Sequence, residues 1–132
     1  MNVVGGRIVR KPCYGLAEIC ERWGVTELDV ANFVAANELT LSVVVAGLAV
    51  EKGSIEDVND RDWCHIPDER GYLSGAADLH QSQAWAALMN GSETISSFKA
   101  EPGRYISIEA RGDDAGTIVV SRERLVVRHA ER

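Results

Sequence analysis

The side chains of this sequence that could bind a metal ion are few and far apart. Zinc is bound mainly by cysteine and histidine, which occur here as Cys13, Cys20, Cys64 and His65. Six residues separate Cys13 from Cys20, whereas structural zinc sites usually pair cysteines separated by about two to four residues. The spacing favours buried, inert thiols over a metal sensor built from the same residues. We therefore predict no metal site and no other cofactor.

Signatures of catalysis are also missing from the sequence. It contains no P-loop and no G-x-S-x-G, H-E-x-x-H or G-x-G-x-x-G motif. His65 and His80 stand in polar stretches without a nucleophile nearby in sequence, which favours surface or hydrogen-bonded roles. We therefore predict that the protein is not an enzyme.

Polar side chains in the first third of the chain could instead serve recognition. Hydroxyl and amide groups can bond base edges or phosphates, and basic side chains can pair with phosphates. On these grounds the candidate DNA contacts are Thr26, Asn32, Asn37, Arg7, Arg10 and Lys11. Glu27 and Asp29 have the opposite charge and would suit a basic protein partner.

Two short helices would position these residues. In the first, apolar side chains recur at i, i+3, i+4 and i+7, at Leu16, Ile19, Cys20 and Trp23. Gly24 suits the end of that helix, because a residue without Cβ readily takes a left-handed conformation. Thr26, followed three residues later by Asp29, predicts the N-cap of the second helix. Residues 14–39 are therefore predicted to be a helix-turn-helix.

The charge of this segment argues against tight binding of DNA. Tyr14–Glu38 contains one basic and five acidic residues, in a chain of net charge −6. Proteins that bind DNA gain much of their affinity from Lys and Arg contacts to phosphate. Positive charge lies before the first helix and near the C-terminus, where it is either a basic rim or a set of scattered surface arginines. Binding is expected to be weak, and a homodimer would double the contacts.

After the second helix the apolar pattern changes from helical spacing to alternation. Leu39, Leu41, Val43 and Val45 predict a strand. Gly47 suits a turn, after which Leu48–Lys52 would return as a second strand, so residues 40–53 are predicted to be a hairpin. This hairpin is either the wing of a winged helix-turn-helix or the start of a small antiparallel sheet.

The rest of the chain is predicted to be a connector followed by a strand, a helix and more strands. Residues 54–70 are polar and would be a connector anchored by Trp63 and Ile66. Residues 71–127 would contain a strand at Gly71–Leu73, a helix at Ser82–Asn90 burying Ala84, Trp85, Leu88 and Met89, a hairpin of Tyr105–Ala110 with Thr117–Val120, and a turn capped by Ser121. The fold class is thus α+β, with short antiparallel strands around one further helix.

Length and composition indicate a single domain at residues 1–132. The chain has 132 residues, of which 45% are hydrophobic and 26% are charged, as in ordinary globular proteins. It has no apolar run of about 18 residues and no leader-like apolar segment after Met1, so no membrane partner is expected. Three cysteines fit reduced thiols better than a disulfide framework, which predicts a cytoplasmic location.

Residues 14–39 resemble the N-terminal helix-turn-helix of excisionase-like and MerR-like regulators. The matching residues are Tyr14, Leu16, Glu18, Ile19, Trp23, Gly24, Val25, Val30 and Leu39. The runs LTLSVVV and VVSRERLVV are similar to small uncharacterised bacterial and prophage-associated proteins, in which a degenerate helix-turn-helix leads into a β-rich remainder. The resemblance implies a role in transcription regulation, although DNA-binding members usually carry more basic and polar side chains on the second helix.

Two hypotheses about function follow. The first is a small transcription-associated regulator with a degenerate, winged helix-turn-helix that binds DNA weakly as a dimer. The second is a non-enzymatic adaptor that binds a protein partner through the helix-turn-helix surface, with Glu27 and Asp29 facing a basic partner.

Overall fold

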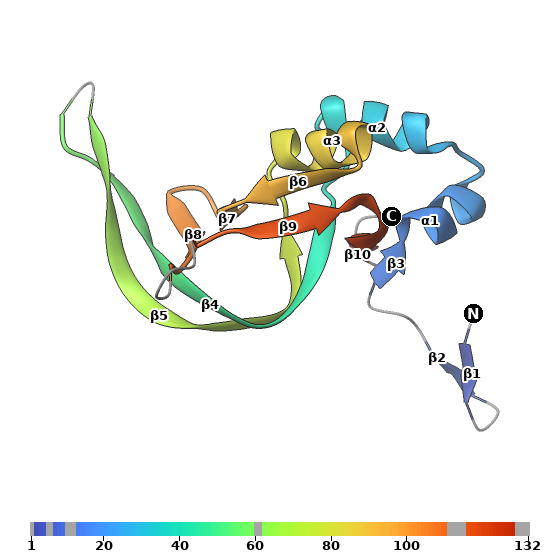
Figure 1. Ribbon diagram of the computed structural model, residues 1–132, viewed down its shortest axis with the longest axis horizontal. Coiled ribbons are helices and arrows are strands. Elements are labelled where there is room, and N and C mark those ends of the chain that lie inside the picture. Colours follow the sequence, from blue (N-terminus) through green and yellow to red (C-terminus); the bar gives the residue numbers. More distant parts are fainter. Residues whose placement is uncertain (1, 5–6, 10–12, 60–61, 111–115, 129–132) are drawn as a thin grey trace.

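The computed structural model describes residues 2–4, 7–9, 13–59, 62–110 and 116–128. In chain order the elements are β1 (Asn2–Val4), β2 (Arg7–Val9), β3 (Cys13–Gly15), α1 (Leu16–Trp23), α2 (Glu27–Ala35), β4 (Ser42–Asp57), β5 (Trp63–Asp78), α3 (Gln81–Asn90), β6 (Ser92–Ile95), β7 (Ser97–Phe98), β8 (Arg104–Ile108), β9 (Ile118–Ser121), the 3-10 helix η1 (Arg122–Arg124) and β10 (Leu125–Arg128). The chain is α+β, but most of its regular structure is strand (Figure 1).

The two N-terminal helices lie where their local signals place them. Gly24 ends α1 in the left-handed conformation, with φ of 66°, and its N–H bonds back to the last turn of the helix. Thr26 and Asp29 form a capping box at the start of α2, in which each side chain accepts a hydrogen bond from the other residue's N–H. These short-range contacts fix the bounds of both helices.

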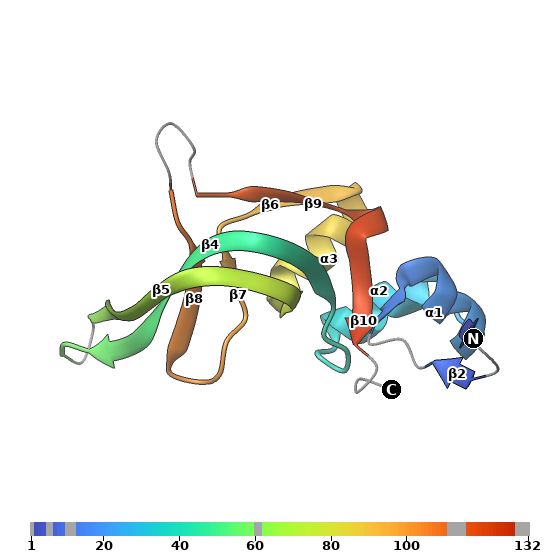
Figure 2. The same ribbon diagram turned by 90° about the horizontal axis from the view of Figure 1, so that it is seen from below.

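The predicted hairpin at residues 40–53 is wrong, and with it the predicted wing. β4 continues for 16 residues to Asp57 and pairs along its whole length with the 16-residue β5. Gly47 does have a positive φ of 62°, but it lies at a shift in the pairing register between Val45 and Leu48. A glycine at a bulge bends a strand without ending it. In Figures 1 and 2 the two strands form one long arch.

The predicted connector at residues 54–70 is wrong for the same reason. Most of these residues belong to the far ends of β4 and β5, where both faces of the hairpin meet solvent and the apolar alternation is lost. Trp63 and Ile66, the expected anchors to the core, are 61% and 46% exposed. The predicted strand at Gly71–Leu73 is a part of β5.

The pairing predicted for the C-terminal strands is also wrong. β8 pairs with β4 and β7, whereas β9 pairs with β6 in a separate two-stranded sheet. The main sheet has the order β3-β10-β4-β8-β7, and β5 takes the opposite edge of β4. Such pairings join segments far apart in sequence, which local turn signals cannot identify.

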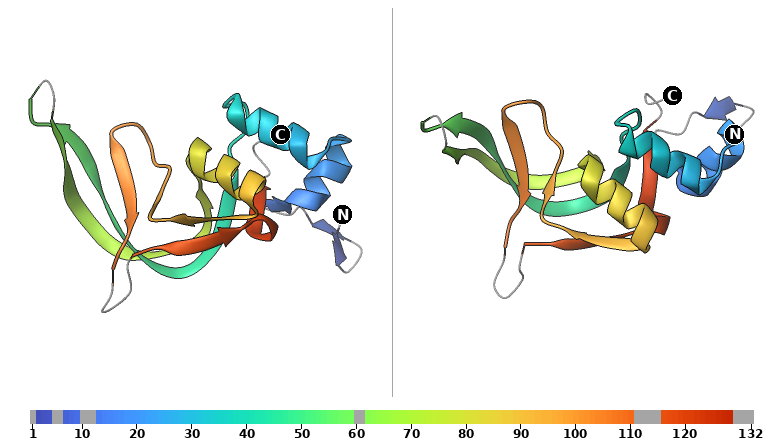
Figure 3. Two further views of the ribbon diagram at one scale, coloured as in Figure 1. Left: turned by 45° about the horizontal axis from the view of Figure 1, so that its top comes forward. Right: turned by 90° about the horizontal axis from the view of Figure 1, so that it is seen from above.

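The core fills the space between the three helices and the sheet. Its fully buried side chains include Ile19, Val30, Val34, Leu41, Val43, Leu79, Ile95, Phe98, Val120, Leu125 and Val127. Figures 1 and 3 show α3 and β6 on the concave side of the arch, with α1 and α2 at one end of it. The helices are therefore held by the sheet, and each leaves one side exposed.

Candidate interaction surface on the second and third helices

One side of α2 is exposed and mostly uncharged. Leu28, Asn32 and Ala35 occur at i, i+4 and i+7, so they lie along one side of the helix, away from buried Val30 and Val34. Leu28 is 61% exposed. A leucine this exposed at the start of a well-formed helix is available to a partner.

The adjacent α3 also has an exposed apolar side, which the sequence prediction placed in the core. Ala84 and Leu88 are buried as expected, but Trp85 and Met89 are 43% and 46% exposed, so that part of the prediction is wrong. The helix packs inward through its alanines and Leu88. Ser82, Trp85 and Met89 then share the outer side, at i, i+3 and i+7.

The exposed sides of the two helices meet in a depression of about 310 Å³ lined by Ala35, Gln81, Ser82 and Trp85. The Gln81 side-chain amide donates a hydrogen bond to the carbonyl oxygen of Ala35 at 2.5 Å, which joins the end of α2 to the start of α3. Figure 3 shows the two helices next to each other. We call this region the α2–α3 surface and define it as Leu28, Asn32, Ala35, Gln81, Ser82, Trp85 and Met89.

The two helices of the α2–α3 surface contain acidic side chains but no basic ones. Neither α2 nor α3 contains a lysine or arginine, and the first turn of α2 carries Glu27 and Asp29. Burial, with added repulsion from these two carboxylates, raises the pKa of the Cys20 thiol on α1. Such a field repels phosphate groups and attracts cations.

The predicted DNA-contacting residues are only partly brought together. Asn32 is exposed within the α2–α3 surface, whereas Asn37 follows α2 in a left-handed conformation with φ of 59°. Arg7 lies in β2, where it pairs with Val4 of β1, and its side chain is not described. Arg10 and Lys11 lie outside the described residues.

Thr26 and Asp29 have a structural role that accounts for their side chains. We expect Thr26→Ala to lower the free energy of unfolding by about 1 kcal/mol, because an N–H of α2 loses its hydrogen-bond acceptor. Urea denaturation measures the change. Thr117→Ala, at an exposed threonine before β9, is the control and is expected to alter it by less than about 0.5 kcal/mol. Equal losses in both variants would contradict a capping role.

The arginines near the C-terminus are engaged with the protein itself. The guanidinium groups of Arg122 and Arg124 donate to the backbone carbonyl oxygens of Leu88 and Val119, at 3.0 and 3.1 Å. Arg128 donates to a carbonyl oxygen of β5 and pairs with Asp78 at 3.0 Å. These three arginines thus hold strands and helices together, and Asp78 offsets the charge of Arg128.

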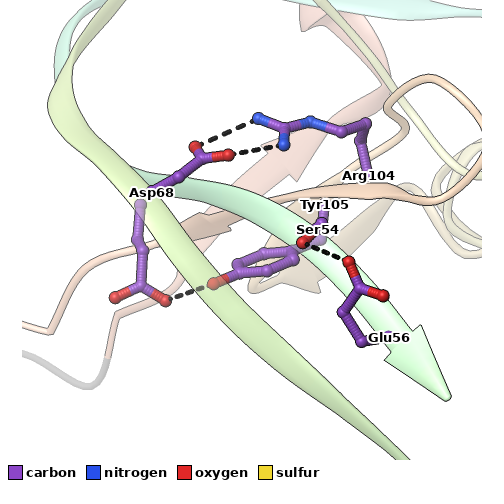
Figure 4. A network of polar contacts seen from close by, with 6 residues as sticks. Ser54, Glu56, Asp68, Arg104 and Tyr105 are labelled. Carbon is purple, nitrogen blue, oxygen red and sulfur yellow. Dashed lines mark hydrogen bonds and ion pairs between the residues drawn. The ribbon is translucent and has the colours of Figure 1, made fainter.

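The arch carries a polar network that sequence analysis missed. Arg104 forms a bidentate ion pair with Asp68, at 2.6 and 3.1 Å, and this hydrogen bonding lowers the pKa of Asp68 (Figure 4). The Tyr105 hydroxyl donates to a Glu51 carboxylate oxygen at 2.9 Å, and burial, reinforced by Glu51, raises the pKa of that phenol. Its ring stacks on that of His65, with 4.0 Å between centroids.

This network joins strands. Glu51 and Glu109 both pair with Arg70, at 3.3 and 3.2 Å, so β4, β5 and the segment after β8 are tied together. Among the described residues, no group of three or more Cys, His, Asp or Glu side chains could hold a metal ion. The sequence gives little signal for such pairs, because the charged residues of β4 and β5 follow no pattern that specifies their partners.

No protein-family model, curated protein or solved structure matches the chain. None of the helices in the described part of the chain has the length and hydrophobicity that a membrane-spanning segment needs.

Proposed function

We propose that the protein is a non-enzymatic adaptor that binds a protein partner through the α2–α3 surface. The observation that carries this proposal is the pairing of exposed Leu28, Trp85 and Met89 with helices that contain no cation. Neighbouring exposed apolar side chains, such as Trp85 and Met89 on one side of α3, are typical of sites that a partner covers. The helix-turn-helix resemblance would place that partner among transcription-associated proteins.

The partner segment that best suits this surface is an amphipathic helix with basic ends. Two adjacent helices with a depression between them can accept the apolar side of a third helix, and Trp and Met are favoured anchors at such sites. Glu27 is exposed at the rim and would pair with a lysine or arginine of the partner. Asp29 caps its own helix, so it would contribute charge rather than a new hydrogen bond.

Weak DNA binding by a dimeric regulator, the other hypothesis from the sequence, has less support from the geometry. Asn32 is the one predicted base contact that is exposed in the middle of α2, and carboxylates precede it.

Direct DNA binding and dimerisation stay predictions. Fluorescence anisotropy with mixed DNA duplexes at low and physiological salt tests the first, because phosphate contacts weaken steeply with salt. Analytical ultracentrifugation of the wild-type protein tests the second.

We also place the adaptor in the cytoplasm. The support is that Cys13, Cys20 and Cys64 are all free thiols, as in proteins of reducing compartments.

The decisive experiment uses two tryptophan variants. A library of labelled amphipathic helical peptides, half with basic and half with acidic flanks, is titrated with wild-type protein, Trp85→Ala and Trp63→Ala. Basic peptides are expected to bind the wild type, and Trp85→Ala should weaken binding at least tenfold, as loss of a central anchor does. Trp63 is more exposed than Trp85 but lies on β5, so its variant is the matched control. Failure of every basic peptide to bind, or equal losses in both variants, would contradict the proposal.

A further inference from the structure

A second site lies on the arch, at a groove whose lining residues differ from those of the α2–α3 surface. It is a groove of about 400 Å³ lined by Lys52, Asp78, Lys99, Ala100, Glu101, Arg104, Tyr105 and Ile106. β4 and the end of β5 form one wall, and β8 with the segment before it forms the other. This volume falls in the range of sites for small organic molecules.

Backbone hydrogen bonds fix the segment between β7 and β8 across the groove. The N–H of Lys99 donates to the carbonyl oxygen of Asp78 at 2.8 Å, and the N–H of Ile55 donates to that of Gly103, also at 2.8 Å. The N–H of Arg104 closes a turn onto Glu101 at 2.9 Å. The wall that carries Lys99 and Glu101 is therefore held at both ends and is ordered before any ligand arrives.

The groove is lined by lysines, which are rare in this chain. The sequence has three lysines, Lys11, Lys52 and Lys99, in a chain of net charge −6, and two of them line this groove. Among the described residues, neither Lys52 nor Lys99 belongs to an ion pair. The Lys99 ammonium lies 3.5 Å from the Thr40 hydroxyl. Their positive charge is thus available to an anion.

The other charged groups of the groove either have a partner within the protein, as Arg104 and Asp78 do, or are negative, as Glu101 is. Asp68 holds the Arg104 guanidinium by both of its carboxylate oxygens. Asp78 accepts from the Ser42 hydroxyl at 2.7 Å and pairs with Arg128. Glu101 is exposed beside Arg104 and can accept hydrogen bonds. The groove is therefore lined by two lysines without an ion-pair partner, by Arg104, whose guanidinium Asp68 holds, and by the carboxylates of Asp78 and Glu101.

We propose that this groove binds a small hydroxylated molecule through its phosphate group. Lysine ammonium groups act as point charges that suit a tetrahedral phosphate, whereas planar carboxylates are recognised best by an arginine fork, which Asp68 occupies here. The carboxylate of Glu101 would accept hydrogen bonds from hydroxyl groups on the remainder of the ligand. The site does not depend on the α2–α3 surface, so it stands or falls independently of the proposed adaptor role.

Isothermal titration calorimetry with ribose 5-phosphate, inorganic phosphate and ribose tests the proposal. Ribose 5-phosphate is expected to bind at one site, inorganic phosphate more weakly, and ribose not measurably. The double variant Lys52→Met with Lys99→Met should weaken binding of ribose 5-phosphate at least tenfold, because charge-assisted hydrogen bonds are lost. Arg22→Met, at an exposed cation on α1, removes positive charge elsewhere and should leave binding unchanged.

Any of three titration results would overturn the site. They are no heat of binding with either phosphate-containing probe, equal binding of ribose and ribose 5-phosphate, and equal losses in the lysine double variant and Arg22→Met. Thermal unfolding of each variant without ligand shows that it is folded. Amide shifts in NMR spectra of the wild type provide a second measurement, and a supporting result moves signals of β4 and residues 99–106. Shifts confined to other elements would also contradict the proposal.

Discussion

Replacing Gly53 with alanine is expected to lower the free energy of unfolding by about 3 kcal/mol, the upper end of what overpacking usually costs. A Cβ at this position would lie 2.2 Å from the backbone carbonyl oxygen of Ile66 and 2.8 Å from the ring of Tyr105. The carbonyl belongs to the paired strand, and the Tyr105 hydroxyl is held by Glu51, so neither can move freely. Urea denaturation followed by circular dichroism measures the loss.

Gly71→Ala is the matched control for this prediction. Gly71 lies in β5, opposite Val50 of β4, and nothing is within 4 Å of a Cβ built there. The same substitution is expected to change the free energy of unfolding by less than about 1 kcal/mol, because a strand residue gains a methyl group in open space. Should both variants lose stability equally, glycine would matter here for general strand flexibility and not for the contact with Tyr105.

Phe98→Ala is expected to be the most destabilising substitution of a core side chain, with a loss of about 3–5 kcal/mol. Phe98 is 1% exposed and is among the largest fully buried side chains of the protein. It lies in the two-residue strand β7, opposite Ile106 of β8. So short a strand has few backbone hydrogen bonds to hold it in place when the buried ring is lost. The midpoint of urea unfolding should fall accordingly.

Val119→Ala separates loss of the core from loss of a strand side chain. Val119 lies in β9 and is 58% exposed, so its removal leaves no cavity and should cost less than about 1 kcal/mol. A Phe98→Ala loss no greater than that of Val119→Ala would show that β7 does not close the core. Retention of native circular dichroism by the variant in the absence of urea confirms that unfolding starts from a folded protein.

The parts of the fold that sequence analysis predicted are those with local signals. Gly24 and Thr26 define the ends of α1 and α2 through contacts within a few residues. The final turn at Arg122–Arg124 also follows Ser121 as predicted, although no hydrogen bond from the Ser121 side chain caps it. In each case the residues that decide the structure are neighbours in the chain.

The parts that were wrong depend on contacts between distant segments. Gly47 has the conformation of a turn residue, but continued pairing with β5 keeps β4 extended through it. An exposed strand has no buried face to impose alternation, so residues 54–70 resemble a connector in sequence. β4 finds β8 some 50 residues away along the chain, and no turn signal specifies such a partner.

The candidate surface was predicted in part. Asn32 and Glu27 are exposed, as recognition residues must be, yet Trp85 completes the surface and was predicted to lie in the core. Helical spacing shows which residues share a side of α3 but not which of its sides faces inward. Small residues settle that choice here, because Ala84 and Ala87 allow close packing while the indole remains outside.

The position of β10 between β3 and β4 sets the order in which this protein can fold during its synthesis. β3 leads directly into α1 and is joined to the main sheet through β10. On the ribosome, α1 and α2 therefore emerge long before residues 125–128, the strand against which β3 must pair. Leu125 and Val127 are fully buried, so this late pairing also closes the core. The core therefore cannot close before residues 125–128 have been synthesised, as in other proteins dominated by contacts between distant segments.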